Sequence, residues 1–204
     1  MRPPGRRTFQ REIGKRRYRK LFVIAVEGST TEQQYFAIFN SSLDLTVHIH
    51  CLRKNDKSSP PHVLKRMKNY LKEKGLRHDD KPWEAWLVVD KDKWTDQQLI
   101  ELFEWSQGRE NYGFALSNPK FEYWLLLHFE DGAGIGSSRE CSNRLKRYLP
   151  DYDKRIEVRK ITRDRIDDAV RRAKERDNPP CSDWPRMTGS TVYRLVDRLL
   201  EKSP

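Results

Sequence analysis

Three carboxylates in this sequence follow short apolar runs. Glu27 comes after residues 21–26, and Asp90 and Asp92 come after residues 86–89. Runs of this kind are typical of buried strands in a parallel sheet. In an open α/β sheet, ligands bind beyond the carboxyl ends of the strands. We therefore expect the three carboxylates to meet at one edge of a sheet and to bind a divalent cation.

The residue types suit Mg²⁺ or Mn²⁺. Magnesium prefers hard oxygen ligands, usually one or two carboxylates, and leaves its other positions to water and phosphate oxygens. One residue separates Asp90 from Asp92, so both side chains can reach one ion, and Glu27 can complete the site or act as a general base. The alternative is that the aspartates only cap a helix or form a turn, and their spacing does not decide between the two.

Two more glutamates, Glu122 and Glu32, could lie near the predicted metal site. Glu122 lies in an apolar stretch, residues 121–127, that predicts a buried helix. A buried carboxylate without a partner is costly, so Glu122 must contact a cation or a helix end, either as a structural pair or as part of the catalytic site. For Glu32, one turn after Glu27, we expect an exposed acid that stabilises the start of its helix.

The chain of 204 residues has a net charge of +11. Residues 1–20, with nine Lys or Arg side chains, predict a flexible basic arm, and a second basic stretch covers 154–176. Such blocks attract polyanions without reading their sequence. Tyr18 and Trp184 could stack on bases. The candidate nucleic-acid contacts are Lys91, Lys93, Arg163, Arg165, Arg171, Arg172 and Arg176. The plainer alternative is a solubilising tail and a solvated helix face.

Composition excludes several classes of protein. No window approaches the roughly 18 uninterrupted apolar residues of a membrane span, and no apolar segment of signal-peptide type follows the basic start. The three cysteines lack the C-x-x-C spacing of zinc sites. The glycine-rich residues 132–138 lack the Gly-Lys-Ser/Thr of a P-loop. We therefore expect a soluble, cytoplasmic protein without structural zinc.

The order of the predicted elements indicates an α/β fold with an open, mostly parallel sheet. The four predicted strands, which alternate with helices, are residues 21–27, 45–52, 84–90 and 112–116. Asn118 and Pro119 are expected to begin the buried helix, as its cap and first residue. Helical stretches near 140–148, 162–176 and 190–201 predict a C-terminal part that packs back on the sheet. The expected units are a basic arm at 1–20, an α/β domain at 21–131 and a helical part at 132–204.

These residues together resemble the RloB-like family, which is associated with bacterial restriction loci and defence against phage. The resemblance covers most of the chain from Leu21 to Leu200 and rests mainly on three strings. They are Val26-Glu27-Gly28-x-x-Thr31-Glu32-x-x-Tyr35-Phe36, Val89-Asp90-x-Asp92, and Leu116-Ser117-Asn118-Pro119-x-Phe121-Glu122-x-Trp124-Leu125-Leu126-x-His128-Phe129. Such proteins look like members of the wider Toprim group, found in topoisomerases, primases and some nucleases.

The resemblance implies a Toprim-like, Rossmann-like sheet with Glu27 as the catalytic acid or base and Asp90 and Asp92 as magnesium ligands. A nuclease of this type would direct a metal-activated water at a phosphodiester of DNA or RNA, including tRNA. The resemblance also implies an ATPase partner protein, because family members are often encoded beside one. Whether the chain forms homo-oligomers is left open.

The favoured function is therefore a metal-dependent nuclease that acts in defence against phage. The main alternative is a non-catalytic sensor module that binds nucleic acid or a partner protein and has a structural metal site. A nucleotidyl or phosphoryl transferase with a small substrate is the third. Topoisomerase activity is not expected, because no tyrosine lies in a recognisable cleavage domain.

Overall fold

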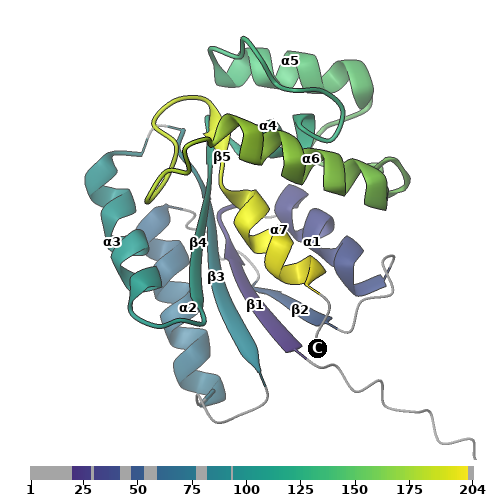
Figure 1. The fold of residues 1–204 in the computed structure, drawn as a ribbon. Coiled ribbons are helices and arrows are strands. Elements are labelled where there is room, and N and C mark those ends of the chain that lie inside the picture. Colours follow the sequence, from purple (N-terminus) through teal and green to yellow (C-terminus); the bar gives the residue numbers. More distant parts are fainter. Residues whose placement is uncertain are drawn as a thin grey trace, which may run out of the picture.

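The computed structural model describes residues 20–28, 30–41, 47–52, 59–76, 82–92 and 94–201. Within these residues five strands form one sheet, with helices on both faces (Figure 1). The strands are β1 (Lys20–Val26), β2 (Val47–Leu52), β3 (Trp83–Asp90), β4 (Tyr112–Asn118) and β5 (Gly189–Ser190). The helices are α1 (Thr31–Ser41), α2 (Pro60–Lys74), α3 (Asp96–Gln107), α4 (Phe121–Leu126), α5 (Ser138–Tyr148), the 3-10 helix η1 (Val158–Lys160), α6 (Arg163–Arg176) and α7 (Val192–Leu200).

The sheet has the strand order β2-β1-β3-β4-β5, and its first four strands are parallel. This confirms the predicted α/β fold. The short antiparallel strand β5 at the edge was not predicted. From β1 the chain first moves outward to β2 and then crosses back to β3, so the chain order reverses between β1 and β3. In open α/β sheets, ligands bind in the crevice at the carboxyl end of such a switch point.

The strands are apolar on both sides because helices cover both faces. In β1, Ile24 and Val26 belong to the apolar cluster on the side of α1 and α7, whereas Val23 and Ala25 belong to the cluster under α2 and α3. All four side chains are fully buried. Alternating contacts with two layers therefore explain why β1 is a continuous apolar run rather than an alternating one.

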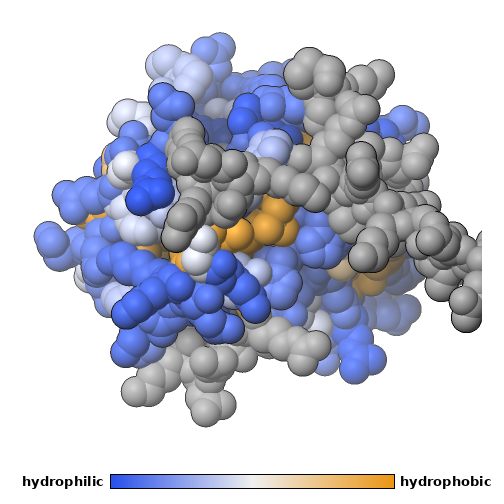
Figure 2. Space-filling view, turned by 90° about the horizontal axis from the view of Figure 1, so that it is seen from below, coloured by the Kyte–Doolittle hydropathy of each residue, from blue (hydrophilic) through white to orange (hydrophobic). Residues whose placement is uncertain are grey.

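The helices after α4 share the core of the sheet. Leu145 of α5, Ile166 of α6 and Val196 of α7 lie in the same apolar cluster as Ile24 of β1 and Val88 of β3. Helices α4, α5 and α6 lie beyond the carboxyl ends of the strands, at the top of Figure 1. Seen from below, the described surface is mainly hydrophilic, with a small apolar strip (Figure 2). None of the described helices has the length and apolar character that a membrane crossing requires.

The start of α4 differs from its prediction. Asn118 ends β4, and its amide group donates to the carbonyls of Pro185 and Arg186 at 3.1 and 3.2 Å. Helix α4 begins at Phe121, whose backbone N–H donates to the Asp90 carboxylate at 2.8 Å. The first N–H groups of a helix lack partners within it. A carboxylate from β3 supplies one here, so the expected Asn118 cap is not formed.

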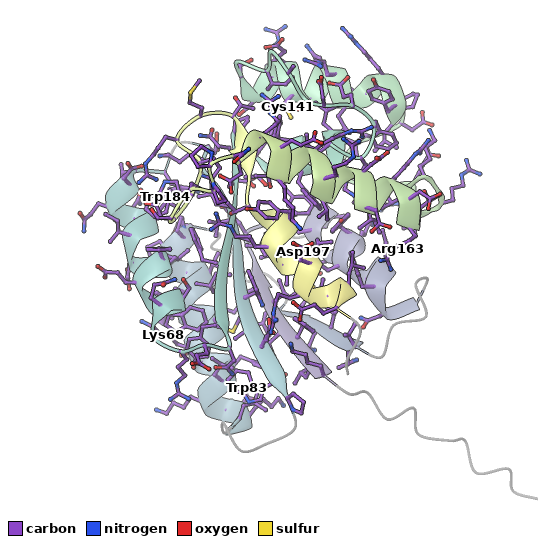
Figure 3. The ribbon with its side chains drawn as sticks, viewed as in Figure 1. Lys68, Trp83, Cys141, Arg163, Trp184 and Asp197 are labelled. Atoms are coloured by element: carbon purple, nitrogen blue, oxygen red, sulfur yellow. The ribbon has the colours of Figure 1, made fainter. Side chains whose placement is uncertain are left out.

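Trp184 is buried, so it does not have the base-stacking role that the sequence suggested. It is 1% exposed and packs edge-on against Phe103 and Phe114, with ring centroids 6.0 and 6.1 Å away. Figure 3 shows it on the side of α3. Its role is to fill the core, so the idea that it stacks on a base is wrong. Tyr18 lies outside the described residues.

Candidate acidic site at the carboxyl edge of the sheet

Glu27 is positioned by the end of β1. Its backbone N–H donates to Val88 O at 3.1 Å, which keeps the residue in the sheet register. Its carboxylate accepts from the backbone N–H of Asp90 at 3.2 Å and from the indole N–H of Trp94 at 2.9 Å. Burial raises the pKa of Glu27 to about 7, the two hydrogen bonds oppose this, and the charges of Glu32 and Asp92 add to it.

Asp90 ends β3, the strand beside β1, and its carboxylate faces the start of α4. Burial raises its pKa well above the ordinary value, and the charges of Glu32, Glu27 and Glu122 raise it further. The hydrogen bond from Phe121 works in the opposite direction. These four carboxylates therefore lie within electrostatic reach of one another, at the carboxyl edge of the sheet where the chain order reverses.

Glu32 is the fourth carboxylate of this cluster, and the expectation that it is exposed is wrong. It is 6% exposed, and its carboxylate accepts from the backbone N–H of Gly28 at 2.9 Å. A Cβ atom at Gly28 would collide with that carboxylate, so a larger residue there would displace the Glu32 side chain. The close approach of Glu32 to Gly28 therefore turns this carboxylate towards the strand ends rather than towards solvent.

Glu122 has the cationic partner that its burial demanded. It is 3% exposed and accepts from Lys154 Nζ at 2.5 Å and from the Tyr152 hydroxyl at 3.0 Å. Burial alone would raise its pKa, but the hydrogen bond and charge of Lys154 outweigh burial and lower it. The predicted buried helix and the predicted pairing of its glutamate are both confirmed. A catalytic role for Glu122 stays a prediction.

The segment that carries Tyr152 and Lys154 was missed by the sequence analysis. Thr31, at the start of α1, holds it in place. The Thr31 hydroxyl donates to Lys154 O at 2.9 Å and lies 3.1 Å from the Tyr152 hydroxyl. More than 120 residues separate these partners in the sequence, so no local pattern links them. Trp94 was missed too, although its place just after Asp92 could have drawn attention to it.

The remaining residues of the Asp90 turn are more exposed. Asp92 is exposed, has a left-handed φ of 28°, and donates its N–H to Pro119 O at 2.9 Å. Its charge contributes to the raised pKa of Glu27, so it lies near that carboxylate. Lys91 forms an ion pair with Asp96 at 3.1 Å. Lys93 and residues 1–19 lie outside the described residues.

All five candidate arginines of α6 form bonds within the chain. Arg163 pairs with Asp167 at 3.0 Å, and Arg171 pairs with Asp168 and Glu175, each at 3.0 Å. The other three donate to backbone carbonyls, Arg165 to Lys160 at 2.7 Å, Arg172 to Leu127 at 2.7 Å and Arg176 to Asp131 at 3.5 Å. Their binding to nucleic acid stays a prediction.

Whether this site can bind a metal ion depends on which side-chain atoms could serve as its ligands. Among the described residues, no three His, Cys, Asp or Glu side chains are already grouped as a metal site would require. The carboxylates instead accept hydrogen bonds from protein donors. They are nevertheless hard oxygen donors crowded at one strand edge, and a divalent cation would remove the repulsion that raises the pKa values of Glu27 and Asp90. The donor set therefore suits such an ion, provided that some side chains turn towards it.

Comparison with known proteins identifies the family. No curated protein and no solved structure matches the chain. One family model does match, described as RloB-like protein, and it covers residues 22–199. This match includes every carboxylate of the acidic site and most of the chain. The protein therefore belongs to the RloB-like family.

Proposed function

We propose that this protein is a metal-dependent nuclease that hydrolyses phosphodiester bonds of DNA or RNA. The observation that carries the proposal is the crowding of Glu27, Glu32, Asp90 and Glu122 at the carboxyl edge of the sheet, where, among the described residues, only Glu122 forms an ion pair with a lysine. Crowded, desolvated carboxylates repel one another, which costs free energy that a bound cation would offset. Perturbed pKa values of this kind cluster at functional sites.

The roles of the residues follow from their settings. Asp90 and Asp92 would hold Mg²⁺ or Mn²⁺, which when bound would activate water and offset the charge of the phosphate. Glu27 would either complete the site as a third ligand or, if it does not contact the ion, accept a proton from the attacking water as a general base. Lys154 keeps a positive charge beside Glu122, and its side chain is 64% exposed, so it can also contact a phosphate.

The proposed biological setting rests on the family rather than on the site. Membership of the RloB-like family supports a role in defence against phage, in the cytoplasm and together with an ATPase partner. A toxic nuclease in such a system would be held inactive until infection.

The test is a cleavage assay with plasmid, single-stranded DNA and total tRNA, each with Mg²⁺ and with Mn²⁺. We expect cutting that requires the metal and falls at least about 100-fold in Glu27→Gln and in Asp90→Asn, because each removes a charge that acts in the reaction. Glu104→Gln is the matched control, since Glu104 is an exposed acid on α3, away from the strand ends, and it should cut as wild type does.

Three results would contradict the proposal in different ways. Cutting retained in both site variants would place the activity elsewhere. Binding of nucleic acid with no cutting under any metal would favour the sensor module. Turnover of mononucleotides without polymer cleavage would favour the transferase.

A further inference from the structure

Helices α5 and α6 are both rich in basic side chains, but they differ in how many of these side chains have partners within the protein. Helix α6 has six basic and four acidic side chains, and its arginines bond within the chain. Helix α5 has four basic side chains and only one acidic side chain, Glu140. The Glu140 carboxylate accepts from the backbone N–H of Gly136 at 3.0 Å, so it pairs with no cation of α5.

The two sides of α5 differ sharply. Its inner side carries Cys141 and Leu145, both fully buried, and Arg144, which pairs with Glu130. Its outer side carries five exposed residues at helical spacing, which we call the α5 basic face: Arg139, Glu140, Asn143, Lys146 and Arg147. None of its three cations forms a hydrogen bond or ion pair with another described residue.

Helix stability does not explain this face. Lys146 and Arg147 are in the last turn, where positive charge interacts favourably with the helix dipole. Arg139 is in the first turn, where a positive charge is unfavourable. Unpaired like charges close together on one helix also repel one another. The helix dipole therefore accounts for Lys146 and Arg147 but not for Arg139, and all three cations, unpaired among the described residues, are free to meet an external anion.

The position of α5 connects this face to the acidic site. Helix α5 lies over α4 beyond the strand ends (Figure 1), and Lys120 at the start of α4 donates to the Ser142 hydroxyl at 2.6 Å. Burial raises the pKa of Cys141 to about 12, with Lys120 opposing and with Glu122 and Asp90 adding to the rise. Figure 3 shows Cys141 on α5 above the sheet. The inner side of α5 thus lies near the carboxylates, and its outer side carries the unpaired cations.

We infer that the α5 basic face binds the phosphate backbone of the nucleic acid that the acidic site cuts. The inference rests on the proposed nuclease function and names the surface that holds its substrate. From Arg139 to Arg147 the face is about 12 Å long at 1.5 Å per residue. Phosphates of one strand recur about every 3.4 Å along a duplex, so the face spans about three to four phosphate intervals and its three cations can contact up to three phosphates.

The test measures binding in the absence of cleavage. The full chain is titrated with fluorescein-labelled single-stranded DNA, duplex DNA and tRNA, with EDTA present, between 50 and 200 mM salt. Each phosphate contact contributes about 0.7–0.9 to the slope of log affinity against log salt. Replacing Arg139, Lys146 and Arg147 by glutamine should therefore reduce that slope by about 2–3. The polymer with the largest change in slope makes the most phosphate contacts with this face.

The matched control removes the same net charge from α2, by replacing the exposed Lys65, Lys68 and Lys72 with glutamine. We expect its slope to change by less than about one unit, because α2 packs on the other face of the sheet from the apolar cluster that contains α5. Equal losses in both triple variants would show that only net charge matters. An unchanged slope in the α5 variant would overturn the inference outright.

The same data separate this inference from the nuclease proposal. If the wild type cuts nucleic acid while the α5 variant binds and cuts normally, the inference fails and the nuclease stands. If the wild type binds through α5 but never cuts, the nuclease proposal fails and α5 is the binding surface of a sensor. Because all three replaced side chains are exposed, both variants are expected to fold, and circular dichroism checks this.

Discussion

Glu27 and Asp90 are adjacent in space through a hydrogen bond between the two strand ends, and burial raises the pKa of each. In the metal-free protein, ionising either carboxylate therefore costs more free energy in the folded state than in the unfolded state. Glu122 differs because Lys154 neutralises it. Removing the charge of Glu27 should therefore stabilise the fold, whereas removing the cation beside Glu122 should destabilise it. Each expectation gives one prediction.

The first concerns Glu27. Its folded pKa of about 7 lies above its ordinary value of 4.5, so the folded protein holds the extra proton between these values. The contribution of this proton is fully present below pH 4.5 and is lost as the pH rises to 7. At pH 8 we expect Glu27→Gln to raise the free energy of unfolding by about 1–3 kcal/mol. Urea denaturation with EDTA at pH 8 and pH 5 measures this, and a variant that is less stable at pH 8 would refute it.

The second concerns Lys154. Among the described residues, Lys154→Met leaves the buried Glu122 with only the Tyr152 hydroxyl as a side-chain donor, and we expect a loss of about 1–3 kcal/mol in the free energy of unfolding at pH 8. The loss should shrink at acid pH, where Glu122 can be protonated. Lys146→Met is the control, because Lys146 is exposed and unpaired, and it should stay within about 0.5 kcal/mol of wild type. Equal effects of the two substitutions would contradict the structural pair.

At the scale of elements, the sequence predicts what is local. The apolar run of β1, the proline start of α2 and its end at Gly75, with a φ of 59°, can all be recognised from neighbouring residues. Two features cannot be. The Asp90 carboxylate caps α4 across 31 residues of sequence, and β5 is a two-residue strand without any pattern of its own. Both depend on the folded sheet bringing distant segments together.

Strand β4 gives an element-scale prediction, because Thr191 completes its outer edge. The Leu116 N–H donates to Thr191 Oγ1 at 2.9 Å, and Thr191 is fully buried. Thr191→Val would leave that N–H without an acceptor, which should cost about 1–3 kcal/mol. Thr191→Ser keeps the oxygen and should cost no more than about 1 kcal/mol for the lost methyl group. Thermal unfolding compares the two, and equal losses would mean that packing, not the hydrogen bond, matters there.

For the whole molecule, metal binding should appear as stability. A ligand that binds only the folded state adds about 1.4 kcal/mol at ten times its dissociation constant. For a chain of this size that is about 3–6 °C in melting temperature. We expect Mg²⁺ to raise the melting temperature of the wild type and of Glu104→Gln but not that of Asp90→Asn. An equal rise in all three would place the ion elsewhere.

The bond between Asp90 and the N–H of Phe121 means that one side chain serves both architecture and chemistry. Asparagine keeps an oxygen acceptor for that N–H while it removes the charge, whereas alanine removes both. Asp90→Asn therefore tests the role of the charge while it keeps the cap of α4. Asp90→Ala removes the charge and the cap together, so its effect cannot be assigned to either one. An ion bound by Asp90 would share this carboxylate with the Phe121 N–H, so ion binding and the stability of the start of α4 are linked through one side chain.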